Sequence, residues 1–171
     1  MHISGPERYK LNFDSTNFQV TCERGTPRFS GIATSKKPKL YIVSADDKPP
    51  FYVGVTKQSL RNRLRLGWKA KGESGYYGYA WRHCKADAFL DVWCQDDAPA
   101  HRQMLDIETL EAEVVFLIRC AGQWPLDQTE IHFHPSSSTH RETAVAVLAR
   151  YALNLSSVPV RAGRGTLTGA R

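Results

Sequence analysis

The clearest pattern of apolar and polar positions lies in the first half of the chain. Two apolar runs, Leu40–Val43 and Phe51–Val55, flank a loop that contains two consecutive prolines, and this arrangement predicts a β-hairpin. Leu60, Leu64 and Trp68 follow at intervals of four residues, a spacing that indicates an amphipathic helix. The arginines of this helix should therefore lie beside the two strands.

Three further segments have the pattern of regular secondary structure. Ala88–Cys94 presents apolar residues to both sides, which predicts a third, central strand. Residues 103–120 carry an apolar stripe at helical spacing. Thr139 and Glu142 match the capping-box pattern at the start of a last helix. Together these elements predict an α/β domain of the α+β type, with a central three-stranded antiparallel sheet flanked by helices.

The same pattern divides the chain into four parts. Residues 1–38 are polar and basic and are expected to form an N-terminal arm, which could be a cover strand or a DNA-contacting segment. Residues 39–135 form the core, and residues 136–154 form a C-terminal helix packed on it. Residues 155–171 are basic and rich in glycine, which predicts a flexible tail.

Charge narrows the range of partners. The chain of 171 residues has a formal net charge of +6, and residues 57–72 hold six basic side chains and no acid. This polarity favours a polyanion such as nucleic acid. No apolar run has the length of a membrane span, so no membrane association is expected. The four cysteines form no C-x-x-C pair, which argues against a zinc knuckle and favours a cytoplasmic location.

The hairpin and helix resemble the signature of the GIY-YIG nuclease superfamily. Leu40-Tyr41-Ile42 stands where the first triplet of that signature would be, and Tyr52-Val53-Gly54 stands at the second. Arg63-Leu64 resembles the arginine motif of the helix that follows. The resemblance covers residues 39–134. It implies a metal-dependent endonuclease that hydrolyses phosphodiester bonds in DNA.

The resemblance implies catalytic roles for two tyrosines and their cationic neighbours. Tyr52 would position or deprotonate the attacking water with Tyr41 as its hydrogen-bond partner, and the reverse assignment stays open. Arg63 would clamp the phosphate, because a guanidinium can bind two oxygens at once. A phenol ionises near pH 10, so a tyrosine base needs cations close by. Lys57, Arg63 and a metal ion would supply them.

A helical glutamate would hold the single divalent ion, Mg²⁺ or Mn²⁺. The resemblance gives this role to Glu113, on the flank of the apolar stripe, with Glu111 as the alternative. Gln128 is the nearest amide to the position of a common family asparagine. The family often places a histidine one turn after the arginine, where this chain has Gly67. Either a residue of the following Tyr76–His83 segment replaces that histidine, or the water is activated in a different way.

Other residues are expected to contact nucleic acid. The basic helix, the glycine-tyrosine loop after it, the lysines before the first strand and a His-x-His strand supply these candidates. They are Arg61, Arg65, Lys69, Lys71, Tyr76, Tyr77, Lys36, Lys37, His132 and His134. Aromatic rings beside cations suit stacking on unpaired bases. Zinc binding by the His-x-His pair is the less favoured reading, because spacing places no third ligand.

Three functions are compatible with these residues. The resemblance is strongest to small type II restriction endonucleases, which cut duplex DNA at specific sequences and often act as homodimers. A structure-specific or single-strand-specific nuclease of repair or recombination is the first alternative. A non-catalytic nucleic-acid-binding module of the same fold is the second.

Overall fold

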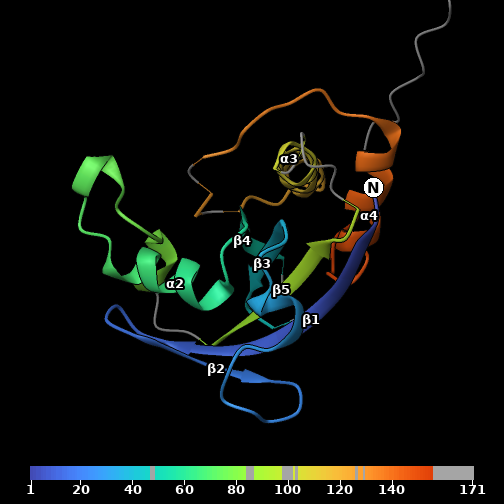
Figure 1. Ribbon diagram of the computed structural model, residues 1–171. Coiled ribbons are helices and arrows are strands. Elements are labelled where there is room, and N and C mark those ends of the chain that lie inside the picture. The colour runs from blue at the N-terminus through green and yellow to red at the C-terminus, as the bar shows by residue number, and fades with distance from the viewer. Residues whose placement is uncertain are drawn as a thin grey trace, which may run out of the picture.

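The structure, a computed structural model, describes residues 1–46, 49–83, 87–97, 102, 104–125, 127–128 and 130–155. Its centre is a five-stranded antiparallel sheet in the order β2-β1-β5-β3-β4 (Figure 1). The strands are β1 (Ile3–Phe13), β2 (Phe18–Cys22), β3 (Lys39–Ser44), β4 (Pro50–Thr56) and β5 (Ala88–Gln95). The helices are α1 (Gly31–Thr34), α2 (Leu60–Lys69), α3 (Leu105–Cys120) and α4 (Ser138–Leu148), with 3₁₀ turns η1 (Glu73–Gly75) and η2 (Ala80–His83).

The α+β class is confirmed, but the prediction of a three-stranded sheet is wrong. β3, β4 and β5 form the three antiparallel strands expected of the core, with β3 between the other two. The segment expected to be an arm adds β1 and β2, because β1 pairs along β5. β1 carries charged residues, so its sequence lacks the apolar pattern that predicts a strand. Arg8 is neutralised by the buried Asp91 of β5, with nitrogen–oxygen distances of 2.8 and 3.0 Å.

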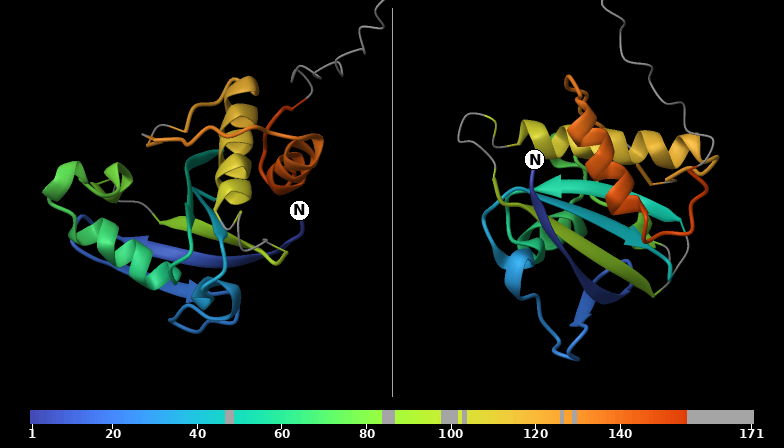
Figure 2. Two further views of the ribbon diagram at one scale, coloured as in Figure 1. Left: turned by 45° about the horizontal axis from the view of Figure 1, so that its top comes forward. Right: turned by 90° about the vertical axis from the view of Figure 1, so that its right-hand side faces the viewer.

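Both faces of the sheet are covered by apolar packing. On β3, Tyr41 and Val43 point into a core shared with β1, α2 and η2, whereas Leu40 and Ile42 point into a core shared with α3 and α4. Figure 2 shows α3 and α4 together on one side of the sheet and α2 on the other. The two cores fix α2 and α3 at opposite faces, so their side chains can meet only at an edge of the sheet.

α2 is held firmly along its length. Leu60, Leu64 and Trp68 are buried against the sheet. At its C-terminal end the guanidinium of Arg82 donates hydrogen bonds to the carbonyl oxygens of Gly67, Trp68 and Ala70, at 2.6, 2.9 and 3.1 Å. These carbonyls would otherwise lack partners at the helix end. The α2 side chains that face the sheet edge therefore have fixed positions.

Two remaining predictions concern the membrane and the tail. Across the described part of the chain, no helix is long and apolar enough to cross a membrane. Of the predicted tail, residues 156–171 lie outside the described residues.

Candidate active site

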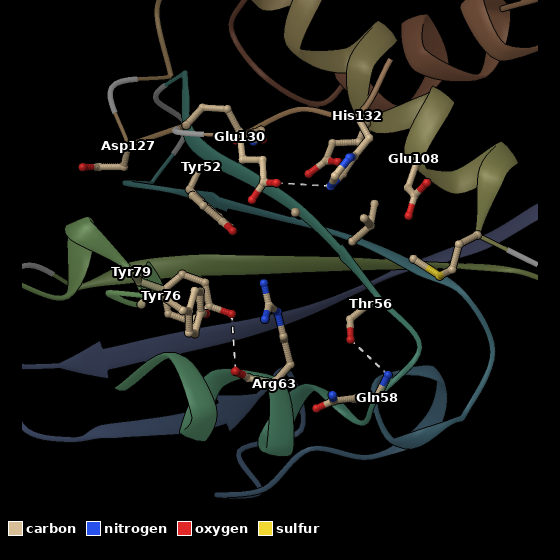
Figure 3. A pocket seen from close by; sticks show the side chains of 16 residues that line it. Tyr52, Thr56, Gln58, Arg63, Tyr76, Tyr79, Glu108, Asp127, Glu130 and His132 are labelled. Carbon is tan, nitrogen blue, oxygen red and sulfur yellow. Dashed lines mark hydrogen bonds and ion pairs between the residues drawn. The ribbon is translucent and has the colours of Figure 1, made fainter. Parts of the chain in front are cut away.

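A pocket of about 310 Å³ opens beside β4, the edge strand of the sheet, between α2 and α3. It is lined by residues of β4, α2, α3 and two loops. They are Tyr52, Gly54, Val55, Thr56, Gln58, Arg63, Tyr76, Gly78, Tyr79, Met104, Glu108, Glu111, Asp127, Gln128, Glu130 and His132. Figure 3 shows Arg63, Tyr76 and Tyr79 on one side of this space, with Glu108, Glu130 and His132 on the other. Both sides face the same volume.

Arg63 and two buried tyrosines form a closed ring of hydrogen bonds. Nε of Arg63 donates to the hydroxyl of Tyr41 at 3.4 Å, and the hydroxyls of Tyr41 and Tyr79 lie 3.1 Å apart. The hydroxyl of Tyr79 donates to the backbone carbonyl of Arg63 at 3.5 Å (Figure 3). Tyr41 is fully buried behind the pocket wall, so it acts on the site through Arg63 and Tyr79.

Two glycines make room for these rings. A Cβ at Gly54 would lie 2.5 Å from Cζ of Tyr41 and 2.9 Å from Cε1 of Tyr52. A Cβ at Gly67 would overlap the ring of Tyr79. No side chain can therefore stand at position 67, where the resemblance leads one to expect histidine. Tyr79, from the segment expected to replace it, fills that space.

Arg63 carries a secure positive charge. Burial opposes ionisation, but the phenols of Tyr41 and Tyr79 outweigh it and raise the pKa of Arg63 above its usual value. Its guanidinium carbon lies 5.7 Å from the ring centre of Tyr76 and 5.8 Å from that of Tyr79. The head group is thus held by two aromatic rings and presented to the pocket.

Tyr52 lies in the pocket as a neutral phenol. Burial, and secondarily the adjacent Tyr41, raise the pKa of Tyr52 well above its usual value. This is the opposite of the lowered pKa that a tyrosine base requires. A protonated phenol can orient a water molecule by hydrogen bonding, so the side chains present favour the positioning role for Tyr52.

Two carboxylates of α3, those of Glu108 and Glu111, line the pocket, and Glu111 is the more deeply buried. It is 5% exposed, and burial, reinforced by the nearby charge of Glu108, raises the pKa of Glu111 to about 8. The positive charge of Arg63 opposes this shift, so the two side chains influence each other across the pocket. An uncompensated buried carboxylate is costly to keep in a fold, and a cation beside it would relieve that cost.

Glu113, the first choice from the sequence, points elsewhere. It does not line the pocket, and Nε of Arg141 in α4 donates to its carboxylate. The two glutamates are two residues apart on a helix, so they leave α3 in different directions. The structure therefore places Glu111, the alternative, in the pocket and Glu113 outside it.

Gln128 closes the outer edge of β4 beside the pocket. Its Oε1 accepts a hydrogen bond from the backbone N–H of Val53 at 3.0 Å. The backbone N–H of Asp127 donates to the carbonyl of Phe51 at 3.3 Å. These bonds occupy part of a strand edge that would otherwise be open to pairing with another chain. Gln128 thus joins the pocket lining and fixes the strand that carries Tyr52.

The histidines differ in their placement. His132 lines the pocket, and its Nε2 is 3.5 Å from Glu130. Nε2 of His134 lies 2.8 Å from Glu108, one of the pocket carboxylates. Lys57 follows β4 and does not line the pocket, whereas its neighbours Thr56 and Gln58 do.

The other expected contacts lie outside the pocket, apart from Tyr76. Lys37 pairs with Asp96 at 3.0 Å, and Lys36 and Lys71 are exposed. Tyr76 lines the pocket, whereas Tyr77 is 73% exposed on the loop beyond it. Arg61, Arg65 and Lys69 are exposed on α2.

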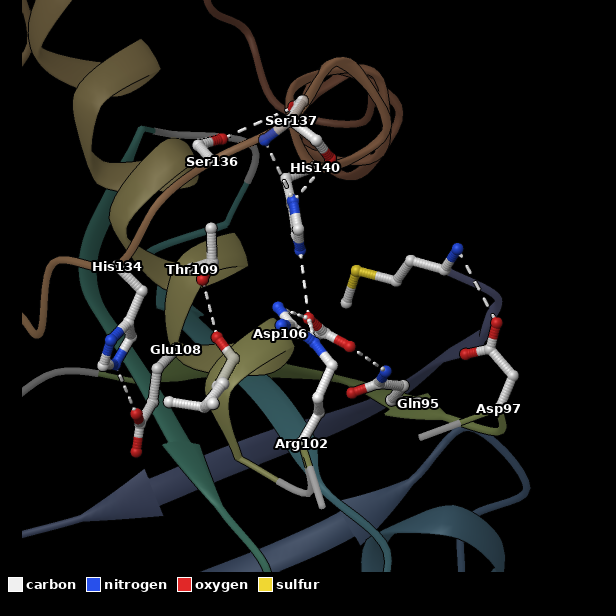
Figure 4. A network of polar contacts seen from close by, with 12 residues as sticks. Gln95, Asp97, Arg102, Asp106, Glu108, Thr109, His134, Ser136, Ser137 and His140 are labelled. Carbon is white, nitrogen blue, oxygen red and sulfur yellow. Dashed lines mark hydrogen bonds and ion pairs between the residues drawn. The ribbon is translucent and has the colours of Figure 1, made fainter. Parts of the chain in front are cut away.

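A second polar cluster joins the starts of α3 and α4 (Figure 4). Ser137 Oγ lies 2.8 Å from Nδ1 of His140, and Nε2 of His140 lies 3.5 Å from Asp106. The backbone N–H of Ser137 also donates to Nδ1, which makes the pair the capping box of α4. The predicted box at Thr139 and Glu142 is wrong by two residues. This cluster is structural, because Asp106 is already paired with Arg102.

The sequence did not identify Tyr79, Glu108, Asp127 or Glu130 as pocket residues. Gly67 was the sequence feature that could have indicated Tyr79, because a residue without a side chain leaves space for a ring beside the expected arginine. Comparison with models of known protein families, with curated proteins and with solved structures gives no significant match to this chain. The chemistry of the pocket is therefore inferred from its own residues.

Proposed function

We propose that this protein is a metal-dependent endonuclease of GIY-YIG type that hydrolyses phosphodiester bonds in DNA. The observation that carries the proposal is the meeting of Tyr52, Arg63 and Glu111 in one pocket. Tyr52 comes from the edge strand β4. Arg63 and Glu111 come from α2 and α3, which pack on opposite faces of the sheet. A phenol, a buried guanidinium and a buried carboxylate supply, in turn, water orientation, phosphate binding and a metal ligand.

The charge balance of the pocket supports a metal-assisted reaction. Of the described residues that line it, four are carboxylates, Glu108, Glu111, Asp127 and Glu130, and one is an arginine, Arg63. A phosphodiester would be repelled by this set unless a cation joined it. Burial, reinforced by the charges of Glu108 and Glu130, raises the pKa of Glu111 to about 8, so this carboxyl group holds its proton near neutral pH. A divalent cation and a proton would then compete for Glu111.

The donors suit magnesium or manganese bound largely by water. Mg²⁺ is usually held by one or two carboxylates, several waters and substrate phosphate oxygens. Within the described residues, no group of three His, Cys, Asp or Glu side chains is arranged to hold a metal ion. Glu111 would therefore share the ion with water and substrate. Such an ion, when bound, polarises the phosphate and assists the leaving 3′-oxygen.

The chain's own residues perform the other steps. Arg63, fixed by Tyr41 and Tyr79, would bind the non-bridging oxygens on which negative charge grows. Tyr52 would hold the attacking water by a hydrogen bond opposite the leaving group. The proton that this water loses would pass to solvent water, and the leaving 3′-oxygen would take a proton from solvent. Gln128 would keep Tyr52 in place by securing the adjacent backbone N–H of Val53. His132 lines the same pocket on the side opposite Arg63.

Cleavage of DNA with and without the metal tests the proposal. Mixed-sequence duplex DNA is incubated with the protein and Mg²⁺ or Mn²⁺, beside a matched reaction with chelator and one with Arg63→Gln. We expect discrete fragments that disappear in both controls, as a restriction-type enzyme requires. Binding of DNA without cleavage under either metal would contradict the proposal and identify a nucleic-acid-binding module.

A structure-specific nuclease is the second candidate, favoured by the loop after α2. Tyr77 is 73% exposed there, and Tyr76 lies over Arg63 at the pocket. Exposed rings of this kind can stack on unpaired bases. Digestion of single-stranded and branched DNA beside the duplex separates the two candidates, because this one requires faster cutting of the unpaired substrates.

A further inference from the structure

The solvent-facing surface of α2 has an ordered distribution of side chains. Leu60, Leu64 and Trp68 define the buried side. At 3.6 residues per turn, Asn62, Leu66 and Lys69 are on the outermost side, and Leu66 is 52% exposed. The arginines occupy the flanks, with Arg63 on one and Arg61 and Arg65 on the other. α2 therefore presents a narrow outer face between two cationic sides.

Arg61 and Arg65 form no side-chain interaction within the described structure. Among the residues that the structure describes, no side chain forms a hydrogen bond or an ion pair with the guanidinium of Arg61 or Arg65. The helix sequence LRNRLRLGWK contains no acid. Two neighbouring cations, Arg61 and Arg65, with no counter-charge from the described residues repel each other, and a polyanion would relieve that repulsion.

Each cationic flank borders its own hollow. Arg63 faces the pocket of about 310 Å³ beside β4. Arg61 and Arg65 line a separate hollow of about 560 Å³ between α2 and the edge strand β2, with Asn17, Gln19 and Thr21 on its far wall. Polar amide and hydroxyl side chains are common partners of sugar and phosphate oxygens. The hollow beside β2 has no acid among the described residues that line it and can therefore accept phosphates directly, whereas the pocket beside β4 can accept one when a cation joins its carboxylates.

The width of the helix between the two hollows matches a dimension of duplex DNA. A helix with its side chains is about 10–12 Å across, and the major groove of B-form DNA is about 12 Å wide. A helix that lies in this groove has one phosphate backbone on each flank and base edges at its outer face. α2 has arginines on both flanks, with Asn62 and Leu66 between them.

We propose that α2 lies in the major groove of duplex DNA, with the phosphates of the complementary strand bound by Arg61 and Arg65 in the hollow beside β2. The position of the cleaved strand, at Arg63, rests on the proposed nuclease function. Asn62 then faces the base edges, where an amide can pair with adenine, and Leu66 faces the methyl group of thymine. The same helix thus binds the substrate and delivers the catalytic arginine.

Equilibrium binding without cleavage tests this inference. Fluorescence anisotropy is measured in chelator with a labelled mixed-sequence duplex and with its separate strands, over a series of salt concentrations. We expect the duplex to bind at least tenfold more tightly than either strand. Because each lost phosphate contact lowers the salt slope by about 0.9, Arg61→Gln/Arg65→Gln should lower the slope for duplex by about 1.8.

A matched variant and two groove ligands make the test specific. Arg24→Gln removes an exposed charge that borders neither hollow, and it should leave the duplex affinity within about twofold. Methyl green, which occupies the major groove, should displace the protein. Netropsin, which occupies the minor groove, should not.

Three results would overturn the inference. They are equal binding of duplex and single strands, displacement by netropsin alone, or a salt slope unchanged by the double arginine variant. The nuclease proposal is judged separately. If the wild-type protein shows the expected binding but never cleaves, the nuclease proposal is lost and the groove position of α2 is kept. If it cleaves but the double variant binds duplex normally, only the groove position is lost.

Discussion

At the level of single residues, the pocket depends on a phenol that is distant in sequence from both signature triplets. Tyr79 occupies the space beside Gly67 and completes the hydrogen-bond ring of Arg63 and Tyr41. Without its hydroxyl, Tyr41 loses one partner and the guanidinium of Arg63 is held less tightly. The geometry therefore makes Tyr79 a positioning residue for the proposed reaction.

The variant Tyr79→Phe should lower kcat about tenfold, equivalent to about 1.4 kcal/mol in the barrier. The ring remains and still fills the space over Gly67, so KM and the melting temperature should change little. Tyr77→Phe is the control, because it removes an equivalent hydroxyl from an exposed ring. Steady-state kinetics on a DNA substrate measures both. A full loss of folding in Tyr79→Phe, or an unchanged kcat, would contradict the positioning role.

Lys39 gives the fold a dependence on pH. The side chain is fully buried at the start of β3, and burial lowers the pKa of Lys39 to about 8. Between that value and the usual pKa of about 10.4, the unfolded chain holds a proton that the folded chain lacks. Stability should therefore rise with pH across this window, by about 1–3 kcal/mol, and should show no such rise from Lys39 below it.

Urea unfolding at a series of pH values measures this slope. Lys39→Met keeps an unbranched chain of similar length and removes the titrating group. We expect the variant to show a flatter dependence than the wild type in the same window. An identical slope in both proteins would assign the effect to other groups.

At the level of secondary-structure elements, the anchoring of α2 is the feature on which the site depends most. Arg82 donates three hydrogen bonds to the C-terminal carbonyls of this helix. Bonds from a charged donor contribute about 1.5–3 kcal/mol. Arg82→Ala should therefore destabilise the protein by about 2 kcal/mol and weaken phosphate binding through a loosened Arg63. Chemical denaturation measures the first effect, and an unchanged midpoint would contradict the capping role.

Most elements of the core could be predicted from periodicity alone. β3, β4, α2, β5 and α3 all lie where apolar spacing placed them, within a few residues. β1 was not recognised as a strand from the sequence. Its charged Arg8 fits into the sheet because it pairs with Asp91, which lies more than eighty residues away in the chain. For a similar reason the sequence could not show which of Glu111 and Glu113 lines the pocket. Only the packing of α4 shows that Arg141 takes Glu113.

At the level of the whole molecule, Asp91 ties distant parts of the chain to the central strand β5. Its fully buried carboxylate is bound by Arg8 of β1 and by the hydroxyl of Tyr151 at 2.8 Å, with Arg150 at 3.5 Å. These partners come from the first strand and from the segment after the last helix. The ends of the fold are thus joined through one carboxylate.

Asp91→Asn would remove the buried carboxylate charge that pairs with Arg8. Breaking one partner of a buried pair costs about 3–5 kcal/mol, so we expect a loss of about that size in unfolding free energy. Asp87→Asn is the matched control, because Asp87 forms an exposed pair with Lys10 at 3.2 Å. Such pairs contribute about 0–1 kcal/mol. Equal effects of the two substitutions on the denaturation midpoint would show that the Asp91 cluster does not hold the fold together.

The assignment of the metal ligand can be decided by a magnesium titration of DNA cleavage with wild type, Glu111→Gln and Glu113→Gln. Thermal melting confirms that each variant is folded. Glu111→Gln should lose about 10³-fold in rate at any magnesium concentration, since several kcal/mol of charge stabilisation disappear with the ion. Glu113→Gln should cleave at nearly the wild-type rate and lose only stability, because it breaks the pair with Arg141. A folded Glu113→Gln without activity, beside an active Glu111→Gln, would contradict the placement of the metal in this pocket.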